Sequence, residues 1–370
     1  MKQNRREWLK SSLGIGGLIL APSTFLSANE VKRFNQREYG LPIKLSSNEN
    51  PYGPSERVLE RVTKAFDFGC RYPYSYADDL AEILAKKHSV DPESIIITGG
   101  STEGLRITGV TFSKGGGEII AAKPTFLALM DYAQKWGANI NWVPVSNNMG
   151  YDLDEVEKRV SKKTKLVFLC NPNNPTGTIV AKEKLKDFCS VVSRKTILFS
   201  DEAYYEFVEE PNYPSMVDLV KEGSNVIVSK TFSKVYGMAG LRIGYLIAKP
   251  DLAKKIRNNV VAMSNVLAIE GAKEALVDKD FFDFSIKKTR EAKESIYKTL
   301  DHIGLKYVKS HTNFIFFKSG IDIRELGPKM LEKGIRIGRP FPPFYDWCRI
   351  STGTSQEVNR FISSMLEVYS

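Results

Sequence analysis

Short apolar runs alternate with segments of helical periodicity along most of the chain before residue 250. The runs lack the regular polar alternation of half-exposed strands, which is typical of strands covered on both faces. We expect strands at 95–97, 118–122, 165–170, 196–200, 225–229 and 242–248. We expect helices at 79–88, 102–112, 128–137 and 182–193. The alternation predicts an α/β fold, in which a mostly parallel sheet is flanked by helices.

The pattern changes near residue 250. Helical stretches at 252–277 and 281–300 precede apolar strands at 312–317 and 348–351. This order is typical of a smaller α+β domain, and we expect residues 41–54 to return to it as an arm. The expected division is therefore a leader at 1–28, an N-terminal arm at 29–60, a large domain at 61–255 and a small domain at 256–370.

Composition and charge argue against several classes of protein. Of the 370 residues, 42% are hydrophobic and 26% are charged, as in folded globular proteins. The net charge of +10 is spread along the chain, and the basic residues at 287–298 are interleaved with Glu291 and Glu294, so we do not expect nucleic-acid binding. The four cysteines and three histidines show no metal-ligand spacing, so no metal site is expected. We expect no stable membrane span.

The first 28 residues have the features of an export signal. Arg5 and Arg6 precede Trp8, an apolar glycine-rich stretch at 13–20, and small residues up to Ala28. A basic start, a short apolar region and a small-residue end are typical of signal peptides, and paired arginines resemble the twin-arginine signal. We expect export to the periplasm by that route. The alternative is an amphipathic N-terminal helix that stays on a cytoplasmic protein.

Lys234 follows the apolar run at 225–229 among small and aromatic residues. Desolvation there lowers the pKa of an amine, and a neutral amine can condense with a carbonyl to form a Schiff base. Thr231, Ser233 and Arg242 offer donors of the kind that bind phosphate. The alternative is an ordinary surface lysine in a loop.

Polar side chains follow two more of the expected strands. Asp201 directly follows the run at 196–200, so we expect it at the carboxyl edge of the sheet. A buried carboxylate there can keep a pyridine nitrogen protonated. Tyr204 and Asn174, the latter in a rigid turn rich in proline and asparagine, can hydrogen-bond a ring oxygen. Asp201 can instead be a helix cap, and the turn at Asn174 can be only a turn.

Gly100, Ser101 and Thr102 lie between an expected strand and an expected helix. Backbone N–H groups at a helix start suit a phosphate group. The segment lacks the Gly-Lys-Ser/Thr ending of a P-loop and is not GxGxxG. On its own it is a weak prediction of a phosphate cup.

The order of these pieces is more specific than any one of them. The phosphate cup, Phe126, Asn174, Asp201, Tyr204, Lys234 and Arg242 follow one another as in the fold-type I enzymes that depend on pyridoxal 5′-phosphate (PLP). More narrowly, the chain resembles the class I and II aminotransferases of the histidinol-phosphate aminotransferase group. The resemblance runs from about Leu45 to the C-terminus.

The resemblance implies a role for each position. Lys234 and Asp201 would be the catalytic residues, and Phe126 would stack on the pyridine ring of PLP. Tyr72 would reach the phosphate of a neighbouring subunit's cofactor, which implies a homodimer.

Substrate binding is implied for four further residues. Arg349 would pair with a substrate carboxylate or phosphate, and Arg339 is a candidate second anchor for an anion. Asn50 and Tyr52 match a segment that closes over the substrate.

The implied reaction moves an amino group from an amino acid or amino phosphate to a 2-oxo acid by a ping-pong mechanism. One alternative is decarboxylation or another lyase reaction on the same fold, and another is an exported PLP-fold protein without turnover. Export also conflicts with a cytoplasmic histidine pathway. We therefore expect a substrate other than the one that the group's name gives.

Overall fold

The computed structural model describes residues 42–370. The predicted leader at 1–28, with its export signal, lies outside the described residues, as do residues 29–41 of the predicted arm. Among the described residues no helix combines the length and apolarity that a membrane crossing requires. Nor do three or more histidine, cysteine, aspartate or glutamate side chains come together there as candidate metal ligands.

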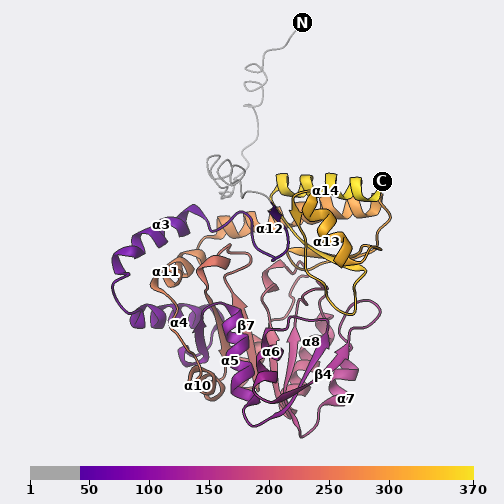
Figure 1. The fold of residues 1–370 in the computed structure, drawn as a ribbon. Coiled ribbons are helices and arrows are strands. Elements are labelled where there is room, and N and C mark those ends of the chain that lie inside the picture. The colour runs from indigo at the N-terminus through magenta and orange to yellow at the C-terminus, as the bar shows by residue number, and fades with distance from the viewer. Residues whose placement is uncertain (1–41) are drawn as a thin grey trace, which may run out of the picture.

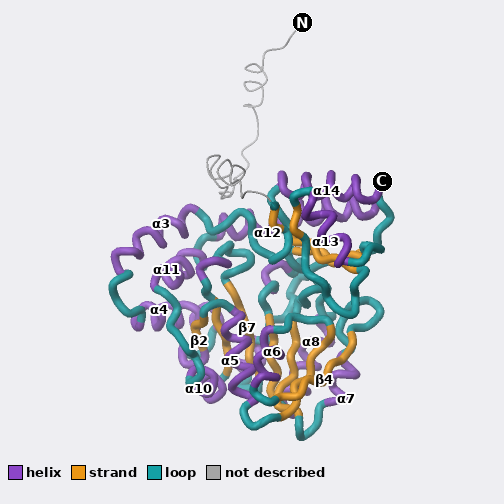
Figure 2. Tube along the Cα trace, in the orientation of Figure 1, coloured by secondary structure: helices purple, strands orange, loops and turns teal. Residues whose placement is uncertain are grey.

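A sheet of seven strands forms the centre of the molecule (Figure 2). In spatial order the strands are β2 (Ile95–Thr98), β8 (Gly244–Ala248), β7 (Val226–Thr231), β6 (Ile197–Asp201), β5 (Thr164–Cys170), β3 (Gly117–Lys123) and β4 (Ala138–Pro144). Strand β8 is antiparallel to both of its neighbours, and the other pairings are parallel. The predicted α/β fold with a mostly parallel sheet is confirmed.

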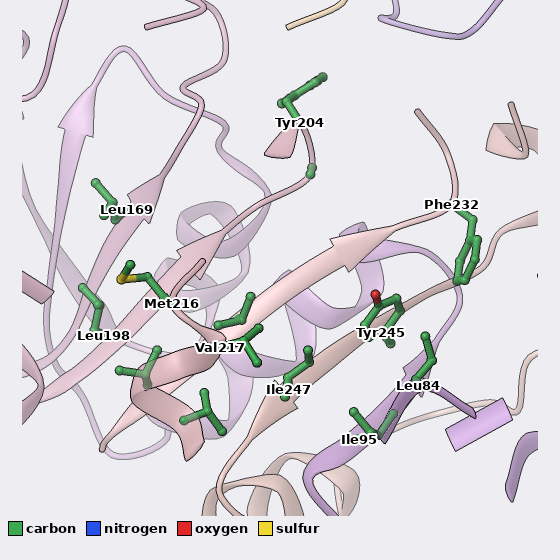
Figure 3. Close-up of a cluster of buried hydrophobic side chains, with 14 of the residues drawn as sticks. Leu84, Ile95, Leu169, Leu198, Tyr204, Met216, Val217, Phe232, Tyr245 and Ile247 are labelled. Atoms are coloured by element: carbon green, nitrogen blue, oxygen red, sulfur yellow. The ribbon is translucent and has the colours of Figure 1, made fainter. Parts of the chain in front are cut away.

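Apolar residues leave both faces of this sheet and enter two separate cores. In β6, Leu198 lies in one core and its neighbour Phe199 in the other, because successive side chains of a strand point to opposite faces. Figure 3 shows the first core, in which Leu198 and Ile247 of the strands gather with Met216 and Val217. Burial on both faces explains why these strands are continuous apolar runs in the sequence.

Helices cover the two faces. Those in the core of Leu198 are α4 (Tyr74–His88), α8 (Lys182–Lys195), α9 (Val217–Lys221) and α11 (Val266–Ala275), and those in the core of Phe199 are α5 (Ser101–Ser113), α6 (Ala128–Lys135) and α10 (Pro250–Arg257). Helix α3 (Glu56–Ala65) packs on α11, and α7 (Leu153–Arg159) packs on α8. Asn265 caps α11 by accepting a hydrogen bond from Ala268 N.

The C-terminal part has its own sheet and core. The elements are α12 (Lys279–His302), β9 (Tyr307–Val308), β10 (Phe314–Lys318), α13 (Ile323–Glu332), β11 (Ile335–Arg336), β12 (Trp347–Ser351) and α14 (Ser355–Tyr369). Strands β12, β10 and β9 form an antiparallel sheet, and β1 (Ile43–Lys44) joins β11 in parallel. Figure 1 shows α12, α13 and α14 together at one end of the molecule. The predicted domain boundaries stay a prediction.

One prediction of local structure is wrong, and one strand of the central sheet was not predicted. The helix expected at 252–277 is two helices, because α10 ends at Arg257 and α11 begins only at Val266. Strand β4 (Ala138–Pro144) was not expected. It forms the edge of the sheet and pairs only with β3, and Asn139 and Asn141 interrupt the apolar run that the other strands have.

Candidate active site

The polar residues singled out in the sequence meet at one edge of the central sheet. The carboxyl ends of the parallel strands and the amino end of the antiparallel β8 lie at this edge. A cavity of about 670 Å³ opens there. Its lining includes eleven of the predicted residues, namely Ser101, Thr102, Phe126, Asn174, Asp201, Tyr204, Ser233, Lys234, Arg242, Arg339 and Arg349.

Lys234 extends into this cavity from the loop after β7. Its Nζ donates to the backbone oxygen of Asn48 at 2.9 Å and lies 5.3 Å from the centre of the Tyr204 ring. Burial lowers the pKa of the amine to about 8, and the nearby charge of Arg349 acts in the same direction. With this pKa about one-tenth of the amine is neutral at pH 7, which is far more than for an ordinary lysine and makes it a competent nucleophile. The alternative of an ordinary surface lysine does not fit this position.

Asp201 is the last residue of β6, and its side chain is 2% exposed. Burial raises the pKa of the carboxyl to about 7. Its Oδ1 has no hydrogen-bond partner among the described residues, and Cys170 Sγ lies 3.9 Å from Oδ2. The alternative of a helix cap is wrong, because the next helical turn starts at Tyr205 and has no side-chain cap. A buried acceptor without a partner suits a cationic N–H donor.

The predicted phosphate cup lies at the start of α5. Gly100 has a φ of 84°, in the left-handed region that favours glycine, and α5 begins at Ser101. The Arg242 guanidinium crosses over Gly100, where a Cβ would overlap it, and its Nη2 donates to Gly99 O at 3.0 Å. The first N–H groups of a helix have no acceptor within it. Together with Arg242 they form a cationic cradle for an anion.

A chain of hydrogen bonds joins three more predicted residues. Asn174 Nδ2 lies 3.5 Å from the Tyr204 hydroxyl, and Asn174 Oδ1 accepts from Arg349 Nη1 at 2.7 Å. Arg349 Nη2 donates to Ser46 O at 2.5 Å. The guanidinium is nearly buried, and its Nε is without a partner among the described residues. Burial lowers the pKa of Arg349 to about 10.

Arg339 and Arg349 lie against the same aromatic ring. Their guanidinium carbons are 4.4 Å and 5.0 Å from the centre of the Phe341 ring. Arg336 lines the cavity as well. Three arginines in the lining of one cavity favour a substrate that carries an anionic group.

Five predicted residues do not line the cavity. Gly100 supports the cup through its backbone, as described above. Thr231 Oγ1 accepts a hydrogen bond from Ser233 N and so shapes the loop before Lys234. Tyr72 is 82% exposed, so its predicted contact with a second subunit stays a prediction.

Asn50 and Tyr52 are the other two. Asn50 Nδ2 donates to Val235 O and to Ser285 Oγ, so this side chain braces the lysine loop from outside the cavity. Tyr52 is buried, and its ring packs edge-on against Phe284. Their predicted role in substrate binding stays a prediction.

Several cavity residues were not predicted from the sequence, among them Asn48, Glu49, Arg336 and Cys170. Asn48 lies two residues before Asn50, in the same segment that the family resemblance singles out, so the sequence could have identified it. Cys170 ends β5 directly beside Asp201, so the rule that placed Asp201 at the sheet edge also applied to it. Arg336 lies in a strand of two residues, which leaves no pattern to read.

The fold and the cavity define a class of enzyme. An α/β sheet whose edge holds a desolvated lysine, a buried carboxylate and an anion cradle is suited to a cofactor with an aldehyde, a ring nitrogen and a phosphate. The family described as aminotransferase class I and II matches residues 42–365, and the chain belongs to this family. The predicted enzyme class and its PLP cofactor are thereby confirmed.

Individual relatives agree with this assignment. The chain is 38% identical to a histidinol-phosphate aminotransferase of Moorella thermoacetica over 90% of this chain and 87% of that protein. It superposes on the histidinol-phosphate aminotransferase of Sinorhizobium meliloti in complex with pyridoxal-5′-phosphate with a TM-score of 0.82 and 27% identity, covering 94% and 95% of the two chains. An L-threonine-O-3-phosphate decarboxylase of Porphyromonas gingivalis gives a TM-score of 0.76 at 25% identity, covering 88% and 99%.

The residues present fit the cofactor. Asp201 Oδ1 is a buried acceptor that a protonated ring nitrogen would satisfy. The cradle of Arg242 and the start of α5 would hold the phosphate, and Lys234 would hold the aldehyde carbon.

Proposed function

We propose that this protein transfers the amino group of an anionic amino donor, such as an amino acid or amino phosphate, to a 2-oxo acid by a ping-pong mechanism. The observation that carries the proposal is that one cavity holds both the desolvated Lys234 amine and the buried Asp201 carboxylate, whose Oδ1 has no partner among the described residues. PLP supplies an electron sink for the bonds at the substrate α-carbon. The rest of the chemistry belongs to the chain's own residues.

Lys234 is suited to move the proton. With a pKa of about 8, its amine can remove the proton from the α-carbon of the donor as a base and, as an acid, would deliver it to the cofactor carbon that carries the aldehyde. Asp201 holds positive charge on the ring nitrogen, and it does so best at a pH where its carboxyl is ionised. Arg349, Arg339 and Arg336 of the cavity lining bind the anionic group of the donor and so orient the α-carbon toward Lys234.

The decisive experiment is a half-reaction. Purified protein loaded with PLP is mixed with one amino donor at a time, including histidinol phosphate, aromatic amino acids and glutamate. The cofactor is then recovered and analysed by chromatography. Conversion to pyridoxamine phosphate by at least one donor is expected. Lys234→Ala should abolish the conversion, whereas Lys254→Ala, at an exposed lysine of α10, should not change it.

The same experiment separates the alternatives. A decarboxylase, such as the Porphyromonas gingivalis neighbour, would release carbon dioxide and keep the cofactor as PLP. A protein without turnover would leave every donor unchanged. Either result with the whole set of donors would refute the proposed transamination.

We also propose a homodimer with shared sites. Large apolar side chains are exposed on the α3–α4 connection and in the loop after α10, among them Phe66, Tyr72 and Val261. Exposed apolar groups of this size are typical of interaction surfaces. Sedimentation should give twice the monomer mass, and Val261→Lys should shift the protein toward monomer.

The export proposal rests on the sequence of residues 1–28 alone. Replacing Arg5 and Arg6 by lysine should leave the protein in the cytoplasm if the twin-arginine route carries it. Equal amounts of the two versions in the periplasmic fraction would contradict that route.

A further inference from the structure

We propose that Asn48 is a positioning residue, which turns the hydroxyl of Tyr204 into a hydrogen-bond donor toward the cofactor. The inference rests on the proposed function, because it needs PLP in the cavity. Asn48 is 1% exposed and lines that cavity next to Lys234.

The side-chain amide of Asn48 is held on both sides. Its Nδ2 donates to the Tyr204 hydroxyl at 2.9 Å. Its Oδ1 accepts from Ser351 Oγ at 2.9 Å, and the same Oγ accepts from Asn48 N at 2.8 Å. Ser351 therefore orients the amide so that the NH₂ group faces Tyr204.

The Tyr204 oxygen then has its acceptor side occupied. Asn48 Nδ2 and, at 3.5 Å, Asn174 Nδ2 both point at it. A hydroxyl that accepts hydrogen bonds is a stronger donor, and its own hydrogen must point away from the two amides. The ring of Tyr204 lines the cavity and lies under Lys234 Nζ, so the cofactor's 3-oxygen, next to the carbon that Lys234 binds, is the acceptor within reach.

The backbone of Asn48 serves Lys234 in parallel. Asn48 O accepts from Lys234 Nζ at 2.9 Å and from Asn313 Nδ2 at 3.1 Å. Its φ of 54° lies in the left-handed region, which asparagine tolerates better than most residues do. One residue thus aligns the two groups on either side of the lysine–cofactor linkage.

The charged and titratable groups around this linkage come from several elements. Arg349, Arg242, Asp201 and Glu49 act on Lys234, and Cys170 acts on Tyr204 together with Arg349 and Asp201. None of them is removed by a substitution at Asn48. A change in titration that follows such a substitution can therefore be assigned to the amide.

The test is a spectroscopic pH titration of the lysine–cofactor linkage in protein loaded with PLP. A donor to the 3-oxygen stabilises its negative charge, so weakening that donor makes the linkage hold its proton more tightly. Asn48→Ala should raise the pKa of the linkage by about 0.7 unit, the equivalent of one neutral hydrogen bond. Ser351→Ala removes the donor that orients the Asn48 amide and adds no charge beside the linkage, and it should raise the pKa by up to the same amount.

A double-mutant cycle distinguishes positioning from a structural role. In a Tyr204→Phe background, Asn48→Ala should cause no further shift, because the hydroxyl through which it acts is missing. Asn225→Ala is the matched control, since Asn225 Nδ2 donates to Ser193 O at 3.1 Å, and neither residue lines the cavity. The control should leave the titration unchanged.

Two results would overturn the inference. One is an unchanged titration in Asn48→Ala, and the other is an equal shift in the wild-type and Tyr204→Phe backgrounds. If Asn48→Ala fails to fold, Ser351→Ala carries the same comparison in both backgrounds. A wild-type protein that shows no lysine–cofactor absorbance would instead refute the proposed function.

Discussion

Asp201→Asn tests how strongly the buried carboxylate destabilises the protein when PLP has been removed. Burial raises the pKa of Asp201 from 3.8 to about 7, and Oδ1 has no partner among the described residues. The folded chain therefore keeps a proton that the unfolded chain has already released. A shift of about three units corresponds to roughly 4 kcal/mol of stability lost once the carboxyl is ionised in both states.

The pH range of this loss follows from the two pKa values. Below about pH 4 the carboxyl is protonated in both states, so its burial has no ionic cost. Between the two values the free energy of unfolding falls as the pH rises, and above about pH 7 the loss is complete. Asparagine does not ionise. The free energy of unfolding of the variant, relative to wild type, should therefore rise by about 3 kcal/mol between about pH 5 and pH 8.

The assay is urea unfolding of the PLP-free protein at both pH values. A fixed cost of the new amide, about 1–3 kcal/mol if it finds no partner, cancels in the comparison between pH values. Asp322→Asn is the control, because hydrogen bonds from Arg324 lower the pKa of Asp322 to about 2. The free energy of unfolding of Asp322→Asn relative to wild type should not change between the two pH values. If the free energy of unfolding of Asp201→Asn relative to wild type were also the same at both pH values, the reasoning would be refuted.

Three other substitutions test separate parts of the site and its support. Arg349→Gln removes the nearly buried cation, so KM for the amino donor should rise roughly 10- to 100-fold with the cofactor still bound. Gly100→Ala places a methyl group against Arg242 at a φ of 84°, so spectral titration should show at least about tenfold weaker PLP binding. Lys230→Met leaves Glu202, 2.9 Å from the lost amine, buried without a cation, so urea unfolding should show about 3–5 kcal/mol of destabilisation.

The sequence was informative wherever a residue follows a strand that is buried on both faces. Asp201, Lys234 and the glycine turn before Ser101 each follow a continuous apolar run, and the parallel arrangement brings the ends of those runs together. A local pattern therefore located residues that are far apart in the chain. Because strand ends follow from the apolar pattern, these positions are predictable without knowledge of any side-chain contact.

The local pattern fails where burial is one-sided or where a helix is interrupted. Strand β4 is covered by a neighbour on one side only, so Asn139 and Asn141 break its apolar run. Between α10 and α11 the sequence offers Asn258, Asn259 and the cap Asn265 as signals of a break. Apolar residues on either side of them nevertheless continue the helical period.

Asn48 shows a different limit. Three of its contacts use backbone groups or reach residues more than 150 positions away, such as Tyr204 and Ser351. A backbone oxygen leaves no mark in the sequence, because every residue has one. Strand ends can therefore identify the groups that do chemistry. The residues that orient those groups can be identified only when the N-terminal segment, the central sheet and β12 are placed together. A substitution at Asn48 therefore tests the structure more strictly than a substitution at a strand end does.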